Sequence, residues 1–428
     1  MFVLIIVTLC ILLMILSLLF FPKIKIGKLK LDTYYIITLI GAFILIIFKE
    51  IKLLEMKELF FNTNGMNPIK IIILFLSMAF LSIYLDKLGF FNYVANLAAM
   101  KFKKSQISLF LALFILISVL TVFTSNDIII LTFTPFICYF CKNTKINPIP
   151  YLVGEFFAAN TLSMTLIIGN PTNIYIASNA GITFLEYFNK MFIIGILTSI
   201  LLCFILLIVF KKHLQEPIIA IEQESIIQSK FLLIIGLIHL ICCTIIMAIS
   251  NYINIPMYLV SLGFATSLIV ITLIYNIVKN NKSKILIKSI NDLPIAFVPF
   301  LISMVILISC LSKTEYVKDL SLLLEKTNSP ILYGASSFLL GNLLNNIPMS
   351  ILFSEIFSTS PANIDAIYEV IAASNLCALF TPLGSLAGMM FISLIKQQEI
   401  DFSFMKFVKY GFIGVILAIF TFTLIIIL

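Results

Sequence analysis

The chain has 428 residues, of which 61% are hydrophobic and only 11% are charged, and its mean hydropathy is +1.15. Soluble domains contain ~45–50% apolar and ~25% charged residues. This composition excludes an ordinary soluble protein and indicates an integral membrane protein, with lipid around it and no nucleic-acid partner. Every basic residue is lysine and the formal net charge is +8, so no arginine is present to bind an anion in bidentate fashion.

Ten apolar runs predict transmembrane helices. The first, residues 2–20, follows no basic segment and precedes no small-residue cleavage site, so we expect a retained helix rather than a signal peptide. Stretches of ~17–25 apolar residues are long enough to cross a hydrocarbon core of ~30 Å as a helix. The predicted spans are 2–20, 33–49, 69–86, 149–180, 190–210, 231–249, 254–278, 293–312, 364–395 and 404–427.

Four of the apolar segments are interrupted by polar residues. Segments 149–180 and 364–395 are too long for one helix and carry Asn, Gly or Pro at their middles, so they predict broken helices. Segments 105–141 and 329–358 are divided by SND and NNIP into halves of only ~15–18 residues, which predicts re-entrant hairpins. Such hairpins are tolerated only where protein or a cavity satisfies the backbone at the tip.

The distribution of lysine predicts the orientation in the membrane. Most of the 28 lysines fall in loops that become cytoplasmic if both termini are extracytoplasmic and the two hairpins open to opposite faces. The remaining lysines lie mostly beside acidic residues. We therefore expect a multi-pass protein of the cell membrane with both termini outside.

The order of elements repeats. Three spans, a hairpin, a broken span and a closing span occur in 1–210 and again in 231–428, joined by a cytoplasmic linker at 211–230. Five crossings per half make the second copy inverted. The strings that begin at Glu155 and Glu369 resemble one another, although chance similarity between short apolar words is an alternative. The predicted fold is therefore all-α, with about ten transmembrane helices, two re-entrant hairpins and two broken helices in two inverted repeats.

Interrupted helices at matching places in inverted repeats are the best sequence indication of a transporter's binding site at the membrane midplane. A helix that restarts inside the membrane directs free N–H groups and a partial positive charge at the gap. Neutral side chains and unwound carbonyls there suit a small oxyanion, a hydroxylated neutral solute or Na⁺, although each break alone could be a packing kink. The predicted binding residues are Ser125, Asn126 and Asp127; Gly169, Asn170, Pro171, Thr172 and Asn173; Asn345, Asn346 and Pro348; and Thr381, Pro382, Gly384 and Ser385.

Asp127 is the most specific single candidate, because a carboxylate at membrane depth costs ~2.5–3.5 kcal/mol even on lenient scales. We expect it to bind a coupling cation or carry a proton, with helix capping as the alternative. The secondary candidates are Asn160, Asn375, Glu155 and Glu369.

No metal site, cofactor or catalytic motif is predicted. Cys138 and Cys141 form a CxxC, but neither a second pair nor a nearby histidine completes a zinc set. The motifs HExxH and GxSxG do not occur. We expect a transporter rather than an enzyme, and the coupling ion would be Na⁺ or H⁺.

Four ordered stretches resemble the arsenite/antimonite permease branch of the ion-transporter superfamily, which also includes sodium/proton antiporters and citrate and sodium-coupled dicarboxylate carriers. They are TSNDIIILTFTP (124–135), IIGNPTNIYIASNAGITFLEYF (167–188), LLNNIPMSILF (343–353) and SNLCALFTPLGSLAGMMF (374–391). The resemblance implies a scaffold and a moving transport unit, elevator-type alternating access and a homodimer; an arsenite pump would also have a partner ATPase. One departure is NNIP at the second tip, where dicarboxylate carriers have a Ser-Asn-Thr type of motif.

The sequence therefore predicts a secondary active transporter of a small inorganic anion or metalloid oxyanion, with arsenite as the named substrate. The alternatives are a Na⁺/H⁺ antiporter that uses Asp127 as the exchange group and a sodium-coupled citrate or dicarboxylate carrier. Substrate, coupling ion, stoichiometry and direction are left open at this stage.

Overall fold

The computed structural model is helical, which confirms the predicted class of integral membrane protein. It describes residues 1–21, 23–26, 29–61, 67–101, 105–217, 227–250, 252–279, 284–359 and 362–428. Within these ranges, six helices have the length and composition of single membrane spans: α4 (Pro68–Lys87), α6 (Gln106–Phe123), α10 (Phe184–Val209), α11 (Lys230–Ala248), α12 (Met257–Val278) and α20 (Phe404–Ile427).

The other long helices are shorter or interrupted. Three of them are α1 (Phe2–Phe20), α2 (Thr33–Ile47) and α14 (Phe297–Ser312). Helices α6 and α7 (Asn126–Thr144) are separated by two residues, and α16 (Pro330–Leu344) and α17 (Asn346–Thr359) by one. Two 3₁₀ turns, Ser163–Thr165 and Ile167–Gly169, separate α8 (Ile149–Leu162) from α9 (Pro171–Asn179). A single 3₁₀ turn, Pro382–Gly384, separates α18 (Ile364–Phe380) from α19 (Leu386–Gln397).

Two features differ from the sequence prediction. The expectation of an all-α chain is wrong at one place, because β1 (Lys23–Ile26) and β2 (Leu29–Asp32) pair as antiparallel strands with Lys23 opposite Asp32. Lysine alternates with Ile or Leu along both strands, which is the period-two pattern of a strand. Four short helices were also not predicted, because they are too short or too polar for a span: α3 (Leu53–Phe61), α5 (Phe90–Lys101), α13 (Ile285–Asn291) and α15 (Glu315–Thr327).

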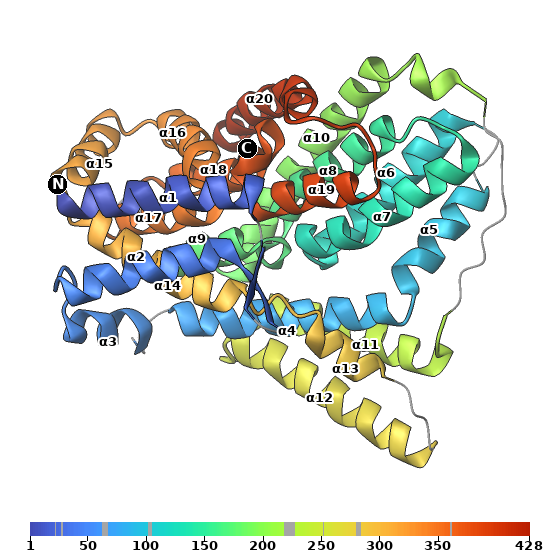
Figure 1. Cartoon of the computed structure of the whole chain (residues 1–428), viewed down its shortest axis with the longest axis horizontal. Coiled ribbons are helices and arrows are strands. Elements are labelled where there is room, and N and C mark those ends of the chain that lie inside the picture. The colour runs from blue at the N-terminus through green and yellow to red at the C-terminus, as the bar shows by residue number, and fades with distance from the viewer. Residues whose placement is uncertain are drawn as a thin grey trace.

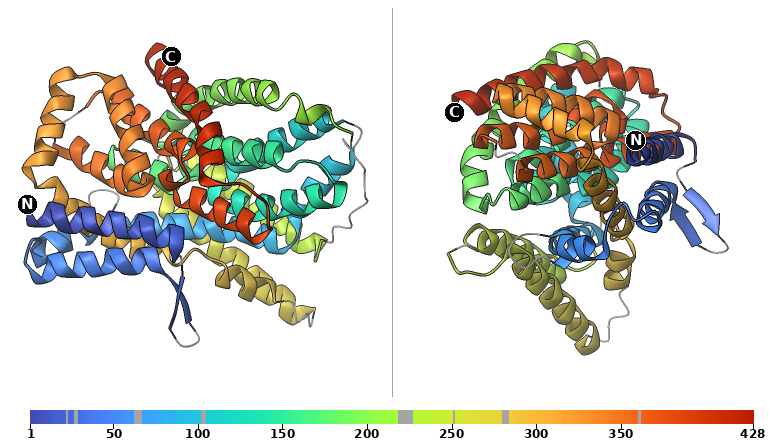
Figure 2. Two further views of the ribbon diagram at one scale, coloured as in Figure 1. Left: turned by 45° about the horizontal axis from the view of Figure 1, so that its top comes forward. Right: turned by 90° about the vertical axis from the view of Figure 1, so that its left-hand side faces the viewer.

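The helices form two layers. We call α1, α2, α4, α11, α12 and α14 the scaffold layer, and α6 to α10 with α16 to α20 the core layer (Figure 1). Helix α5 passes between the layers at one end of the molecule, and α15, which turns by 78° from α14, lies at the other end (Figures 1 and 2). The C-terminal ends of α10 and α12 lie at the same end as α5 (Figure 1).

Polar contacts between helices stabilise the scaffold layer at two places. The Ser303 hydroxyl on α14 donates to Thr38 on α2 over 2.7 Å, and the hydroxyls of Tyr84 on α4 and Thr272 on α12 lie 2.8 Å apart. Hydrogen bonds between helices replace the hydrophobic driving force that is missing in lipid. The two contacts join α2 to α14 and α4 to α12.

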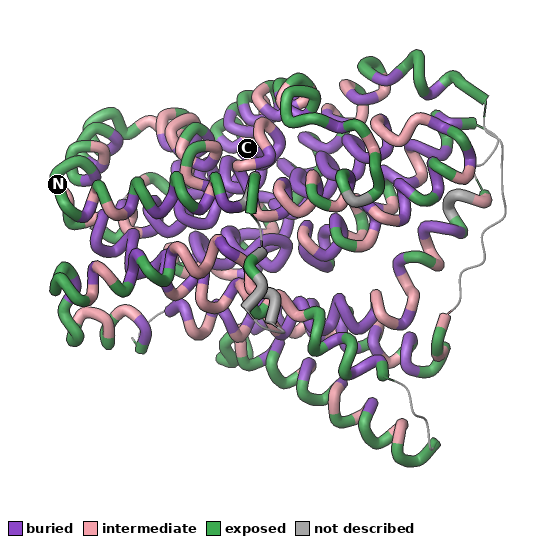
Figure 3. The backbone as a smooth tube through the Cα atoms, viewed as in Figure 1, coloured by how far each residue is buried: buried purple, intermediate pink, exposed green. Residues whose placement is uncertain are grey.

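Helices α8 and α18 form the centre of the core layer, where nearly every residue is buried (Figure 3). Helix α18 packs between α16 and α20, while α8 packs against α6, α7 and α10. The outer helices α11 and α12 instead expose Ile and Leu side chains such as Ile241 and Leu273, which suits a surface that faces lipid. The interrupted helices thus lie in the interior of the molecule rather than at its periphery.

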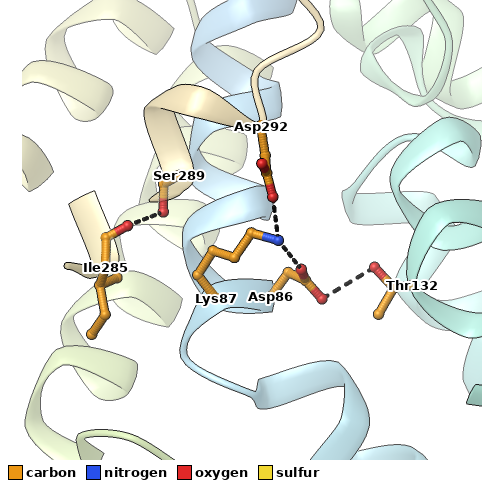
Figure 4. Close-up of polar contacts among 6 residues, drawn as sticks. All are labelled: Asp86, Lys87, Thr132, Ile285, Ser289 and Asp292. Carbon is orange, nitrogen blue, oxygen red and sulfur yellow. Dashed lines mark hydrogen bonds and ion pairs between the residues drawn. The ribbon is translucent and has the colours of Figure 1, made fainter. Parts of the chain in front are cut away.

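A charged cluster at the end of α4 joins the two layers (Figure 4). Asp86 accepts a hydrogen bond of 3.1 Å from the Thr132 hydroxyl on α7. Lys87 pairs with Asp86 at 3.2 Å and with Asp292, after α13, at 2.5 Å. The cluster therefore connects a scaffold helix, a core helix and a short helix of the second half of the chain.

Close helix packing in the core layer makes one glycine sensitive to substitution. A methyl group on Gly411 of α20 would collide with the carbonyl oxygen of Phe380 at the end of α18. We expect Gly411→Ala to destabilise the protein by ~1–3 kcal/mol because overpacking at a helix contact forces the backbone apart. The measurement is the melting temperature of the purified protein in detergent.

Gly263 is the matched control, because no atom lies within 4 Å of the position that its Cβ would take on α12. Gly263→Ala should leave the melting temperature unchanged or raise it slightly, since alanine favours helix by up to ~1 kcal/mol over glycine. Equal melting temperatures for the two variants would contradict the close α18–α20 contact.

Candidate functional site

The first break contacts α18 at Asn375, six residues before the second break begins at Thr381. The Oδ1 atom of Asn375 accepts hydrogen bonds from Ser163 at 2.8 Å and from the Asn170 amide at 3.0 Å. Its Nδ2 atom donates to Oδ1 of Asn173 over 2.7 Å. Asn173 in turn donates to the carbonyl oxygens of Ser163 and Leu166 in the unwound segment. One side chain from the second half of the chain thus stabilises the break in the first half.

The hairpin between α6 and α7 contacts this centre through Asn126. Its Nδ2 donates to Oδ1 of Asn160 on α8 over 3.0 Å, and Asn160 donates back to the Phe156 carbonyl of its own helix. Both asparagines are buried. The first hairpin tip is therefore held against the helix that precedes the first break.

The hairpin between α16 and α17 contacts the second break in a similar way. Asn346 donates to the Ser374 carbonyl on α18 over 3.1 Å, and Asn345 donates to the Leu383 carbonyl in the 3₁₀ turn over 3.1 Å. The Ser374 hydroxyl lies 2.9 Å from that of Thr172 at the start of α9. The Ser163 hydroxyl also lies 2.7 Å from the Asn160 carbonyl oxygen, so these contacts connect the first tip, the first break and the second tip. Asn345 joins the second tip to the second break.

Polar side chains cap the helices that restart at these points. Ser125, Asn170 and Ser385 accept from backbone N–H groups at the beginnings of α7, α9 and α19. Asn345 precedes α17 with a φ of 83° and accepts from the Ile347 N–H. Helix N-termini carry a partial positive charge and N–H groups without a helical partner. Four such N-termini therefore belong to the network region, which suits an oxygen-rich solute.

The remaining predicted residues shape the breaks. Pro171 and Pro382 begin the elements that follow Asn170 and Thr381, where a missing N–H costs nothing, and Pro348 lies in the first turn of α17. The Thr381 hydroxyl donates to Asn342 of α16 over 2.8 Å.

Gly169 and Gly384 permit the unwound chain to fold back on the preceding helix. A Cβ atom on Gly169 would collide with the Ser163 carbonyl, and one on Gly384 would lie 2.6 Å from the Cys377 carbonyl. Any larger residue at either position would push the unwound segment away from its helix. This close approach explains a glycine in each break.

The network consists of neutral side chains. Among the described residues, neither lysine nor a carboxylate forms any of its hydrogen bonds. Two buried side-chain oxygens, Oδ1 of Asn126 at the first tip and Oγ1 of Thr161 on α8, have no hydrogen-bond partner among the residues that the structure describes. Buried oxygens without donors are the type of ligand that Na⁺ and water prefer.

Two small cavities lie beside the network, each with about 10 Å³ of free space, which is about the room for one water molecule. Each is bounded by scaffold helix α4 on one side and by a break and a hairpin tip on the other. The first includes Ile71, Phe297, Pro171, Thr172, Ile347 and Ser350, and the second includes Phe75, Met78, Thr124, Ser125, Ile128 and Ile168.

The three predicted carboxylates have different surroundings. Asp127 lies half-buried in the first turn of α7 and takes no part in the network, and its charge is favourable beside that helix N-terminus. Glu155 is buried and accepts from the Thr134 hydroxyl with both oxygens, at 2.9 and 3.1 Å. Glu369 is buried with neither oxygen bonded to any described residue. Asp127 therefore fits the capping alternative in position, and its role in coupling stays a prediction.

Sequence reasoning missed four residues that contact the site residues. Ser163 and Ser374 belong to the network, Asn342 receives the Thr381 hydrogen bond, and Thr134 binds Glu155. Ser163 lies one helical turn after Asn160 and Ser374 directly precedes Asn375, so both share a stretch with a predicted residue. Asn342 and Thr134 had no sequence signal, because each acts from the arm of a hairpin rather than from a break.

A buried polar network at interrupted helices is typical of membrane transporters. The chain belongs to the citrate transporter (CitMHS) family, whose model matches residues 33–373. This match covers most of the chain and includes both hairpins and the complete first break.

Several relatives resemble the chain over most of its length. A "46 kDa membrane protein" of Mycobacterium leprae is 23% identical over 400 residues, which are 89% of this chain and 90% of that protein. A Bacillus subtilis protein provisionally named an arsenical pump membrane protein is 23% identical over 404 residues, covering 86% of this chain and 88% of the relative. A Dictyostelium discoideum protein provisionally named transporter arsB is 30% identical over 145 residues, but the match spans only 26% of that protein. The chain is thus a secondary transporter with citrate-type and arsenical-type relatives.

The hub position of Asn375 predicts a large effect of its removal. Asn375→Ala would leave the Asn170 amide and the Asn173 Oδ1 atom without their partner on α18, and each buried polar group left unpaired costs ~1–3 kcal/mol. We expect a lower melting temperature and a loss of transport, measured on purified protein in detergent and in liposomes.

Asn179→Ala is the matched control, because Asn179 donates only to the Tyr175 carbonyl of its own helix. This variant should retain transport and melt close to the unmodified protein. Equal losses of stability in the two variants would show that Asn375 has no special role.

Proposed function

We propose that the chain is a secondary active transporter of a small inorganic anion or metalloid oxyanion, with arsenite as the substrate. The observation that carries this proposal is the neutral network around Asn375, beside which four helices restart. Arsenous acid is uncharged near neutral pH and presents only hydroxyl groups. Amide and hydroxyl side chains can donate to and accept from such a solute without any fixed charge.

The composition of the network favours arsenite over citrate. Citrate carries several negative charges at neutral pH and requires cations to offset them inside a membrane. The network contains no lysine among the described residues, and the chain has no arginine. The arsenical name of the Bacillus subtilis relative, which covers 86% of this chain, agrees with this choice. The family name and the free oxygen of Asn126 favour the sodium-coupled carboxylate carrier as the second candidate.

The proposal includes two inverted repeats. Contacts in the first half have counterparts in the second: α1–α2 corresponds to α11–α12, α2–α14 to α12–α4, and α6–α8 to α16–α18. Helix α9 packs against α17 of the opposite half, and α19 packs against α7. Such reciprocal packing is expected when two copies of one unit are related by a pseudo-two-fold axis.

Transport would occur by movement of the core layer against the scaffold layer, which is elevator-type alternating access. The polar network joins elements within the core layer only, so both breaks and both tips can move together. Helices α5 and α15 connect the layers at opposite ends of the molecule (Figure 1). The proposal also includes a homodimer in the cell membrane with both termini extracytoplasmic.

Flux measurements on liposomes test the substrate. Purified protein should accumulate arsenite in an imposed pH or Na⁺ gradient, and excess citrate should not inhibit this flux. Arsenic content of the washed liposomes is the readout, with protein-free liposomes as the control. Citrate uptake driven by Na⁺, without arsenite flux, would instead identify the carboxylate carrier. Na⁺ movement driven by pH without any anion would identify the antiporter.

Crosslinking tests the movement of the layers. In the double variant Asp86→Cys plus Thr132→Cys, a short reducible thiol crosslinker would join α4 to α7 across the two layers. We expect crosslinking to abolish flux and a reducing agent to restore it, because the two layers can no longer slide.

The matched control is Thr198→Cys plus Thr421→Cys. These two hydroxyls lie 2.9 Å apart on α10 and α20, within the core layer. Crosslinking there should leave flux intact. If the α4–α7 crosslink also left flux intact, movement between the layers would be excluded.

A further inference from the structure

Glu369 differs from Glu155, the other buried carboxylate of the described chain, in having no side-chain hydrogen-bond donor. It lies fully buried on α18, and the polar group beside it is the backbone N–H of Gly334 on α16. A buried ionised carboxylate is stable only with a counter-charge or several donors. Among the described residues neither a counter-charge nor a set of several donors is present, so this conformation favours the uncharged acid.

The contact with α16 is unusually close. Gly334 lies against the carboxyl group, so that a Cβ atom there would collide with Oε2, and Phe422 of α20 packs beside the same glycine. The carboxyl group is therefore enclosed by backbone and aromatic carbon. Glu155, at the corresponding place before the first break, instead faces the Thr134 hydroxyl, whose single hydrogen is shared between both carboxyl oxygens.

No charged group of the surrounding elements reaches the carboxyl oxygens. The only ion pair described near the beginning of α18 joins Asp365 to Lys190 at 2.9 Å, with side chains 26% and 22% exposed. The titratable and charged groups on the elements that contact α18 are Asp365, Tyr368 and Cys377 on α18; Tyr333 on α16; Glu355 on α17; Tyr175 on α9; Tyr151 and Glu155 on α8; Glu186, Tyr187 and Lys190 on α10; Lys396 on α19; and Lys406, Lys409 and Tyr410 on α20.

Glu369 lies on α18 between the network residue Asn375 and the partly exposed Asp365. Asp365 is four residues earlier, about 6 Å along the helix, and Asn375 is six residues later, about 9 Å along it. A proton on Glu369 thus lies one helical turn from a partly exposed ion pair. It is also within the rigid helix that supplies the hub of the binding network.

We propose that Glu369 is the proton-binding residue that couples transport to the pH gradient. The group exchanges one proton: the carboxylic acid releases H⁺ to water when movement of the core layer admits water to the α16–α18 contact, and the carboxylate takes up H⁺ before the contact closes. The closed conformation favours the protonated form, because the described residues supply neither a cation nor a side-chain donor to the carboxyl group. This inference rests on the proposed transport function and identifies H⁺ as its coupling ion.

Infrared spectroscopy tests proton binding without any substrate. The protein in lipid nanodiscs should show the carbonyl stretching band of a buried carboxylic acid, and this band should disappear on titration to alkaline pH. Glu369→Gln should lack that component, while Glu369→Asp should retain an acid band at a shifted position. Glu355→Gln, the same change on neighbouring α17, is the matched control and should keep the band. The assignment would be overturned if Glu369→Gln removed no component of the acid band, or if the component that it removes did not titrate in the unmodified protein.

Arsenite flux measurements distinguish a role of Glu369 in proton coupling from a role in transporting the substrate itself. In liposomes, Glu369→Gln should retain arsenite counterflow, which needs no net proton movement, and lose the component driven by a pH gradient. Retention of the pH-driven component would overturn the proposal. Loss of counterflow as well, with an unchanged melting temperature, would also overturn it, since the residue would then serve binding rather than coupling. If the unmodified protein carried no arsenite in either mode, the proposed substrate would be wrong, and the infrared titration alone would decide proton binding.

Discussion

Backbone groups released by interrupted helices must find partners inside the protein, because hydrocarbon supplies none. Both breaks and both hairpin tips of this chain are largely buried within the protein. Side-chain amides donate hydrogen bonds to several of their backbone carbonyls. Asn173 accepts from Asn375 and donates to two carbonyls of the unwound segment. Asn345 and Asn346 each donate to a carbonyl near the second break. Asparagine is suited to this task, since one side chain donates and accepts without charge.

The same requirement gathers polar groups where the proposed solute would bind. Side chains that satisfy the breaks in the closed structure are those that a polar solute would have to engage, and capped helix N-termini add N–H groups around them. Hydrogen bonds within the network can be exchanged for bonds to a hydroxylated solute with little change in electrostatic energy. The charges of a multiply charged solute would not be offset, because the chain contains no arginine and no lysine of the described residues takes part in the network.

The three candidate carboxylates have different surroundings for local reasons. Asp127 is only half-buried and lies beside a helix N-terminus, where a negative charge is stabilised. Glu155 faces a hydroxyl donor on α7, and Glu369 faces the backbone of α16 at Gly334. The residue type alone therefore indicates that a buried carboxylate costs free energy, but it does not indicate what the carboxylate does. Only the groups opposite each carboxylate distinguish one beside a helix N-terminus from one that has a hydroxyl donor and from one that we propose holds a proton.

The sequence by itself determined the membrane class, the helical character and the chemical type of the site residues, because hydropathy, length and cap residues act locally along the chain. It did not determine the strand pair at 23–32 or the short helices α3, α5, α13 and α15, because these segments are too short or too polar to register as spans. Only the tertiary structure decided which polar residues meet: Asn375 was a secondary candidate in the sequence and is the hub of the network. The isolation of Glu369 likewise depends on Gly334, 35 residues away in the chain. Burial and hydrogen-bond partners are set by helices packing across the chain, and that information is absent from any local pattern.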